Sequence, residues 1–134
     1  MKYLLCLFLA GCNWPSQISF FFPAAPDDAF AAATQAASEW NAACPGVQLD
    51  VTRSVGDVPI HIVPGEMIAP ALAVTHRHSI QREPDFMLVS EGAQTWRSVY
   101  AHEMGHALGL DHHDQGIMLP QTHPDLHVTP ADCP

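Results

Sequence analysis

Residues 102–112 read His-Glu-Met-Gly-His-Ala-Leu-Gly-Leu-Asp-His. His102 and His106 are four positions apart, so on a helix both rings project from one face and can share a metal ion. Gly109 can adopt a left-handed conformation that ends the helix, and the chain can then bring His112 back as a third ligand. Three protein ligands leave the fourth position of a tetrahedral zinc ion open for water, which is typical of catalytic zinc sites.

Glu103 lies beside these histidines on the helix, close enough to reach a water on the metal without being a ligand. Two histidines at this spacing also occur by chance on amphipathic helices, so the first five residues alone are a weak signal. The added glycine and third histidine favour a zinc site over coincidence. We therefore expect one catalytic zinc ion held by His102, His106 and His112, with Glu103 as the general base.

The stretch Ala101–Asp111 (AHEMGHALGLD) and the following Met118-x-Pro120 resemble the metzincin clan and, within it, the matrixins. Met118 matches the residue of the Met-turn that packs beneath the zinc. Astacin-like and serralysin-like members carry a tyrosine soon after this methionine, and none follows Met118 here. The resemblance implies an α/β (α+β) zincin-like fold with a small twisted mixed sheet, a packing helix and an active-site helix. It also implies a zinc-dependent endopeptidase that hydrolyses proteins or peptides.

The resemblance also indicates where an extended substrate would bind. Ala71–Thr75 resembles the family's edge strand, which pairs with the substrate backbone and gives affinity with little sequence preference. The segment Leu119–Thr122 would form part of the wall beyond the cleaved bond. We expect substrate contacts from Ala71, Leu72, Ala73, Leu119 and Pro120.

The family's second, structural zinc uses a histidine after a Leu-Ala pair, but Val74 follows Leu72-Ala73 in this chain. His76 and His78 could substitute, although in a polar loop we expect both to be solvated. A structural zinc is therefore not expected, and the loop is too short for the family's calcium sites. The C-terminal helix of the family is reduced to Thr129–Cys133 at most.

The rest of the pattern predicts one mixed α/β domain. Strands are expected at 17–22, 47–53, 58–63 and 85–90, with residues 54–57 as a turn. A first helix follows Asp27 and Asp28, with an apolar stripe at Phe30, Ala33, Ala37, Trp40 and Cys44. A second helix is expected from Trp96 to about Leu110, with Thr95 as its N-cap.

Composition excludes one class of function. The chain of 134 residues has a formal net charge of −9, with five Lys and Arg residues in total. A nucleic-acid-binding protein needs a basic surface that replaces counterions, and five cations cannot build one. We expect a monomer whose partners are its protein or peptide substrates.

The first residues predict export. Lys2 and the apolar run 3–10 read as a signal peptide, and Leu9-Ala10-Gly11-Cys12 resembles the lipobox of bacterial lipoproteins. We expect a signal over 1–11, acylation of Cys12, a tether over 12–16 and a peptidase domain over 17–134. The protein would then be anchored by its lipid to a membrane of the cell envelope. An ordinary secretory signal, or an uncleaved apolar start, is the alternative.

Two cysteines remain in the mature domain once Cys6 is removed with the signal and Cys12 carries lipid. In an oxidising compartment, Cys44 and Cys133 are most simply a disulfide. Two free buried thiols are the alternative.

Another class of function remains open, namely a non-catalytic zinc-binding surface lipoprotein that recruits a partner through the same cleft. Loss of Glu103 would support it, and Glu103 is present. An unstable gene remnant, given the shortened last helix, is a further alternative.

Overall fold

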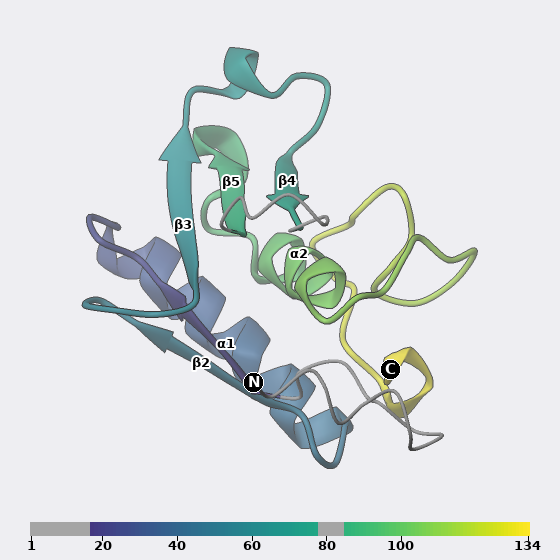
Figure 1. Cartoon of the computed structure of the whole chain (residues 1–134). Coiled ribbons are helices and arrows are strands. Elements are labelled where there is room, and N and C mark those ends of the chain that lie inside the picture. The colour runs from purple at the N-terminus through teal and green to yellow at the C-terminus, as the bar shows by residue number, and fades with distance from the viewer. Residues whose placement is uncertain (1–16, 78–84) are drawn as a thin grey trace.

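A computed structural model describes residues 17–77 and 85–134 of the chain, and its elements run from strand β1 to a C-terminal 3₁₀ turn (Figure 1). The regular elements are β1 (Gln17–Phe21), α1 (Asp27–Ala43), β2 (Gln48–Thr52), β3 (Val58–Val63), β4 (Ala73–His76), β5 (Phe86–Ser90) and α2 (Arg97–Ala107). Three short 3₁₀ turns, η2, η3 and η4, lie at Gly65–Met67, Glu91–Ala93 and Pro130–Asp132.

The five strands form one sheet in the order β2-β1-β3-β5-β4. The first four are parallel, and β4 pairs antiparallel with β5 at the edge. Residues 54–57 therefore do not close a hairpin between β2 and β3, because β1 lies between these two strands. Asp57 instead ties the start of β3 to β1, since its carboxylate accepts bonds from the Ser19 N–H and hydroxyl at 2.9 and 3.0 Å.

Helix α1 packs through small residues, as its alanine-rich sequence predicts. Five alanines of α1 are buried, which lets the helix approach its neighbours closely. Trp40 is fully buried on the same helix, and its indole N–H donates to the carbonyl of Ala101 at 2.9 Å. Phe30 departs from the predicted stripe because it is half-buried under the guanidinium of Arg53, 4.3 Å from its ring centre. Helix α1 thus fixes the position of α2 directly.

Helix α2 is shorter at both ends than the sequence predicts. Its N-cap is Trp96 rather than Thr95, and no side chain caps it. The Trp96 N–H donates to Ala93, so the chain enters α2 from the turn η3 and leaves no place for a threonine cap. The helix ends at Ala107, before the turn made by Gly109.

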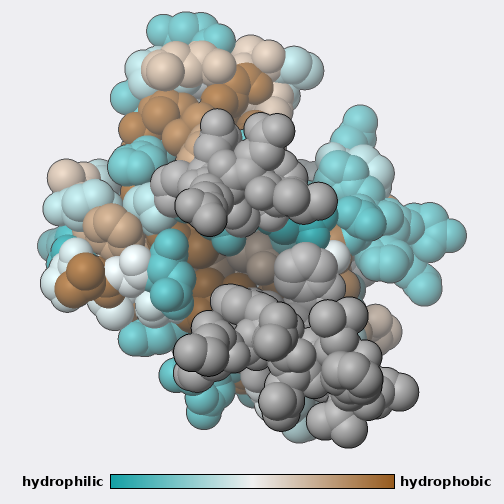
Figure 2. Space-filling model, viewed as in Figure 1, coloured by the Kyte–Doolittle hydropathy of each residue, from teal (hydrophilic) through white to brown (hydrophobic). Residues whose placement is uncertain are grey.

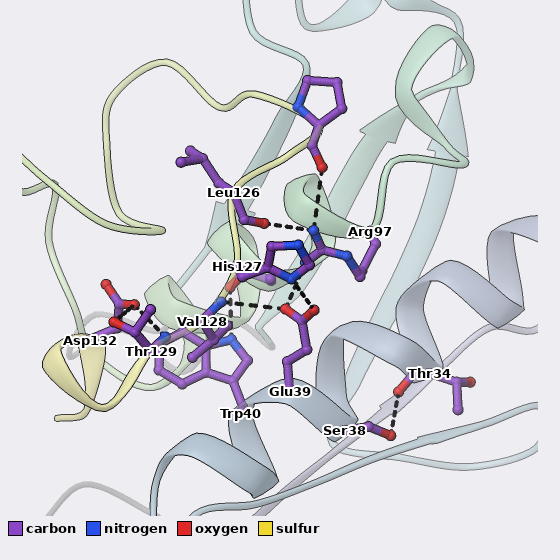
Figure 3. Close-up of polar contacts among 12 residues, drawn as sticks. Thr34, Ser38, Glu39, Trp40, Arg97, Leu126, His127, Val128, Thr129 and Asp132 are labelled. Atoms are coloured by element: carbon purple, nitrogen blue, oxygen red, sulfur yellow. Dashed lines mark hydrogen bonds and ion pairs between the residues drawn. The ribbon is translucent and has the colours of Figure 1, made fainter.

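The C-terminal tail is held against both helices by one ionic cluster (Figure 3). Arg97 at the start of α2 pairs with Glu39 of α1 at 2.6 Å, and the other oxygen of Glu39 lies 2.8 Å from His127 of the tail. The Arg97 guanidinium also donates to the Leu126 carbonyl at 2.7 Å. The residues that follow His127 are thereby brought back toward α1.

The outer surface carries one group of exposed apolar side chains around the β3–β4 connection. Met67, Leu72 and Val74 are 66%, 39% and 40% exposed, and Figure 2 shows apolar surface at this end of the molecule. In the part of the chain that the structure describes, neither α1 nor α2 has the length and apolar character needed to cross a membrane.

Candidate active site

The end of α2 gives the three histidines their arrangement. Gly109 has φ +95°, a conformation that favours glycine, and its N–H donates to His106 while the Leu110 N–H donates to Gly105. These are the two bonds of a Schellman motif, which turns the chain sharply at the end of a helix. The turn brings His112 back over the helix, as the sequence predicts.

The Nε2 atoms of all three rings converge on one point. Nε2 of His112 lies 3.2 Å from Nε2 of His102 and 3.2 Å from Nε2 of His106. Three nitrogens bound at ~2.0–2.1 Å to one tetrahedral zinc ion would lie roughly 3.3–3.4 Å apart. The spacing therefore fits a single zinc ion, and these are the residues that would hold it.

Two of the rings are oriented by backbone carbonyls. Nδ1 of His102 lies 2.8 Å from the Ile117 carbonyl, and Nδ1 of His106 lies 2.8 Å from the Leu110 carbonyl. A carbonyl only accepts, so each Nδ1 carries the proton and each Nε2 presents its lone pair. Hydrogen bonds of this kind, made by the nitrogen that does not bind the metal, fix the tautomer that a metal requires.

Burial also favours the neutral form of these ligands. Desolvation lowers the pKa of His102 to about 4, and the bond to Ile117 offsets this only in part. Desolvation likewise lowers the pKa of His106 below its usual value. Both rings are therefore neutral at pH 7, so a metal ion need not displace a proton from either of them.

Met118 packs beneath this site, at the position that the sequence predicts for the Met-turn. Its side chain is fully buried against Gly105, where a Cβ atom would overlap the Met118 sulfur and lie 3.2 Å from Trp40. Only glycine leaves this space, so Gly105 allows Met118 to reach the back of the helix between the two histidines. The His113 N–H donates to the Met118 carbonyl at 2.9 Å, which joins the turn to the His112 loop.

The C-terminal segment supports the Met-turn from outside. One oxygen of Asp132 accepts the Ile117 N–H at 3.1 Å, and the other accepts the Thr129 N–H at 2.8 Å. The next residue, Cys133, forms a disulfide with Cys44 at the end of α1. The predicted disulfide is therefore present. It ties the neighbouring Asp132, which supports the Met-turn, to the end of α1.

Glu103 is a buried carboxylate with 5% of its surface exposed. The Thr75 hydroxyl on β4 donates to its Oε2 at 2.5 Å and lies 3.2 Å from its backbone carbonyl. Burial raises the pKa of Glu103 to about 7, although the bonds from Thr75 act in the opposite direction. A carboxyl group with this pKa can both accept and release a proton near neutral pH.

A cleft of about 540 Å³ runs between β4 and the end of α2. Its walls include Glu103 and the three histidines together with residues 70–75 and 120–122. Ala71, Leu72, Ala73 and Pro120, which the sequence predicts as substrate contacts, all line it. Leu119 is not among the lining residues; it is half-buried, and its N–H is directed to Gly116.

Among the described residues, no strand pairs with the outer edge of β4, along which an extended peptide could bind in this cleft. The Ser90 N–H donates to the Leu72 carbonyl at 2.8 Å, so this pair is hydrogen-bonded. Bonded pairs alternate in an antiparallel ladder, so Val74 is directed toward β5 while the backbones of Ala73 and Thr75 face the free edge.

The sequence model of the matrixin family matches residues 25–132. The chain belongs to the matrixin family. No curated protein matches the chain. The five-stranded sheet, the two helices and the three-histidine site agree with this family and confirm the predicted mixed α/β metzincin fold.

Several other histidines of this matrixin lie away from the zinc site. His113 and His61 are exposed. The expectation that His76 is solvated in a loop is wrong, because His76 ends β4, is half-buried and stacks on Phe86 with ring centres 4.8 Å apart. His127 pairs with Glu39 of α1. His78, Cys12 and the segment 1–16 lie outside the described residues.

Sequence reasoning missed two residues that support the matrixin site. Thr75 was placed in an extended segment, but its hydroxyl contact with Glu103 joins residues 28 positions apart. Asp132 lies in a tail without periodicity, although Thr129 and Asp132 form a capping box that a Thr-x-x-Asp pattern could have indicated.

Proposed function

We propose that this matrixin is a zinc-dependent endopeptidase that hydrolyses proteins or peptides outside the cytoplasm. The observation that carries the proposal is a cluster of three histidines in the same cleft as a buried glutamate, with Nε2 of His112 3.2 Å from Nε2 of both His102 and His106. His102, His106 and His112 would hold the ion. When bound, zinc supplies Lewis-acid chemistry, since it polarises a peptide carbonyl and lowers the pKa of water toward ~7.

Substrate would bind as an extended chain beside β4. The backbone N–H and C=O groups of Ala73 and Thr75 pair with a peptide that adds to the sheet edge. Such pairing uses main-chain groups, so it holds many sequences in the same position. The peptide bond to be cleaved then lies across the cleft that Glu103 lines.

Glu103 would move the proton during hydrolysis. Its carboxylate accepts a proton from the water that attacks the carbonyl carbon, which forms the new C–O bond. It then delivers this proton to the amide nitrogen as the C–N bond breaks, so a free carboxyl end and a free amine leave. With an ion held by the three histidines, Glu103 would be ionised before attack, since a nearby positive charge lowers the pKa of a carboxyl group.

The test separates metal binding from proton transfer. His112→Ala removes one of three ligands, so zinc content and peptidase activity should fall together. Glu103→Ala keeps all three ligands, so zinc should remain while turnover falls by ~10²–10⁴-fold. Elemental analysis measures the zinc content. A peptide library measures the cleavage activity. His113→Ala is the matched control, because it removes an exposed neighbour of His112.

Two results would contradict the proposal. Near-normal hydrolysis by Glu103→Ala would remove the proton-transfer role even with zinc in place. A wild-type protein that retains zinc but cleaves no peptide would favour a non-catalytic protein that recruits a partner.

We further propose that the chain is exported and anchored by an acylated Cys12. The support is the sequence Leu9-Ala10-Gly11-Cys12 after a short apolar run. Intact mass and detergent partitioning should show a lipid that Cys12→Ser removes. An unacylated product that begins elsewhere would contradict the anchor and favour a secreted protein.

A further inference from the structure

Thr75 belongs both to the outer edge of β4 and to the surroundings of Glu103. Its backbone lies on the free edge of β4, and its hydroxyl contacts the Glu103 carboxylate on α2. The hydroxyl has one proton and two acceptors within reach, the Glu103 carboxylate oxygen at 2.5 Å and the Glu103 carbonyl at 3.2 Å. The carboxylate oxygen is the nearer of the two acceptors, so the hydroxyl proton belongs to the carboxylate contact.

The hydroxyl is held firmly by its strand. Thr75 pairs with the fully buried Met87 in the β4–β5 ladder, which fixes the backbone. Threonine is branched at Cβ and therefore has few side-chain rotamers available. The position of the hydroxyl relative to α2 thus follows from the sheet and does not depend on a flexible side chain.

We propose that Thr75 is the positioning residue of the general base, and that its hydroxyl holds Glu103 Oε2 and leaves Oε1 to accept the proton from water. The inference rests on the proposed function. It also joins substrate binding to proton transfer, because a peptide that pairs with the Thr75 backbone binds the residue that orients Glu103.

Thr75→Val tests this directly, since valine has the same shape without the hydroxyl. In the zinc-loaded protein, we expect kcat to fall ~10- to 100-fold with KM nearly unchanged, because the base is misplaced while the sheet edge is kept. Thr75→Ser should recover most of the lost kcat. Thr52→Val is the matched control, because Thr52 ends β2 at the opposite edge of the sheet and its hydroxyl donates to the Val55 carbonyl.

A second measurement uses the metal-free protein and needs no activity. Thr75→Val should lower the melting temperature when Glu103 is present, because the buried carboxylate loses its donor. In a Glu103→Ala background, the same substitution should lower the melting temperature clearly less. The zinc content of every zinc-loaded variant is measured separately.

Several results would overturn the inference. These are a Thr75→Val protein with wild-type kcat, a serine variant as poor as the valine variant, or equal melting losses in both backgrounds. Loss of zinc in Thr75→Val would show that the hydroxyl supports the metal site and does not position the base. If the wild-type protein holds zinc but cleaves nothing, the proposed function fails. The losses of melting temperature caused by Thr75→Val, with and without Glu103, still test the contact between Thr75 and Glu103.

Discussion

Asp132→Ala should weaken a metal site that Asp132 does not touch. Asp132 accepts the N–H of Ile117, and the carbonyl of the same residue orients His102 at 2.8 Å. The carboxylate also accepts the N–H and hydroxyl of Thr129 at 2.8 and 3.0 Å. Alanine removes all three acceptor contacts, so both the tail and the Met-turn lose a support.

The magnitude follows from these contacts. The buried Ile117 loses the partner of its N–H, which costs about 1–3 kcal/mol. Loss of the capping bonds at Thr129 adds ~1 kcal/mol. We therefore expect the free energy of unfolding to fall by about 2–4 kcal/mol. Zinc affinity should fall ~10-fold, the lower end for residues that act through a ligand's partner.

Urea unfolding of the metal-free protein measures the first effect, and competition with a chelator of known affinity measures the second. Asp132→Asn should be intermediate, since it keeps one acceptor oxygen. Asp125→Ala, at an exposed carboxylate of the same tail, is the control. A destabilised Asp132→Ala protein with wild-type zinc affinity would refute the connection through Ile117.

Three further expectations concern stability. Replacing Cys44 and Cys133 by alanine opens a loop of 89 residues, so unfolding should become easier by ~4–5 kcal/mol in the chain-entropy model, and a loss below ~1 kcal/mol would contradict it. In the metal-free protein, burial raises the pKa of Glu103 to about 7, so its ionisation opposes folding increasingly as the pH rises from ~4.5 to that value. Glu103→Gln should therefore raise the melting temperature at pH 8 but not at pH 4, and an equal gain at both would refute this. Glu39→Ala leaves the Arg97 guanidinium, only 10% exposed, with backbone carbonyls but no carboxylate to balance its charge, so it should cost about 3 kcal/mol in urea unfolding. The exposed pair of Asp27 is the comparison and should contribute less than ~1 kcal/mol.

The zinc ligands could be predicted because their arrangement is local. A helix places His102 and His106 on one face, and Gly109 needs only its own backbone freedom to bring His112 back. Met118 could be assigned by its resemblance to a family motif, while the reason for its packing, the space at Gly105, required the fold.

The remaining features depend on contacts between distant segments. The order of the strands could not be read from the chain, because β1 separates β2 from β3 and no local pattern marks this insertion. The contact of Thr75 with Glu103 requires β4 and α2 to be placed first. The end of α2 was predicted too late because Leu108 continues the apolar pattern after the helix has ended.

The backbone bonds that fix the histidine tautomers also bring the lone pairs of neighbouring rings close together. Nε2 of His112 faces two lone pairs at 3.2 Å and has at most one proton to offer, so at least one of these contacts is repulsive. Folding without metal therefore works against this repulsion, which an ion converts into attraction. Zinc then acts as a ligand of the native state and adds ~4 kcal/mol when its free concentration is 1,000 times the dissociation constant. The concentration of free zinc around this protein would thus change its stability as well as the proposed activity.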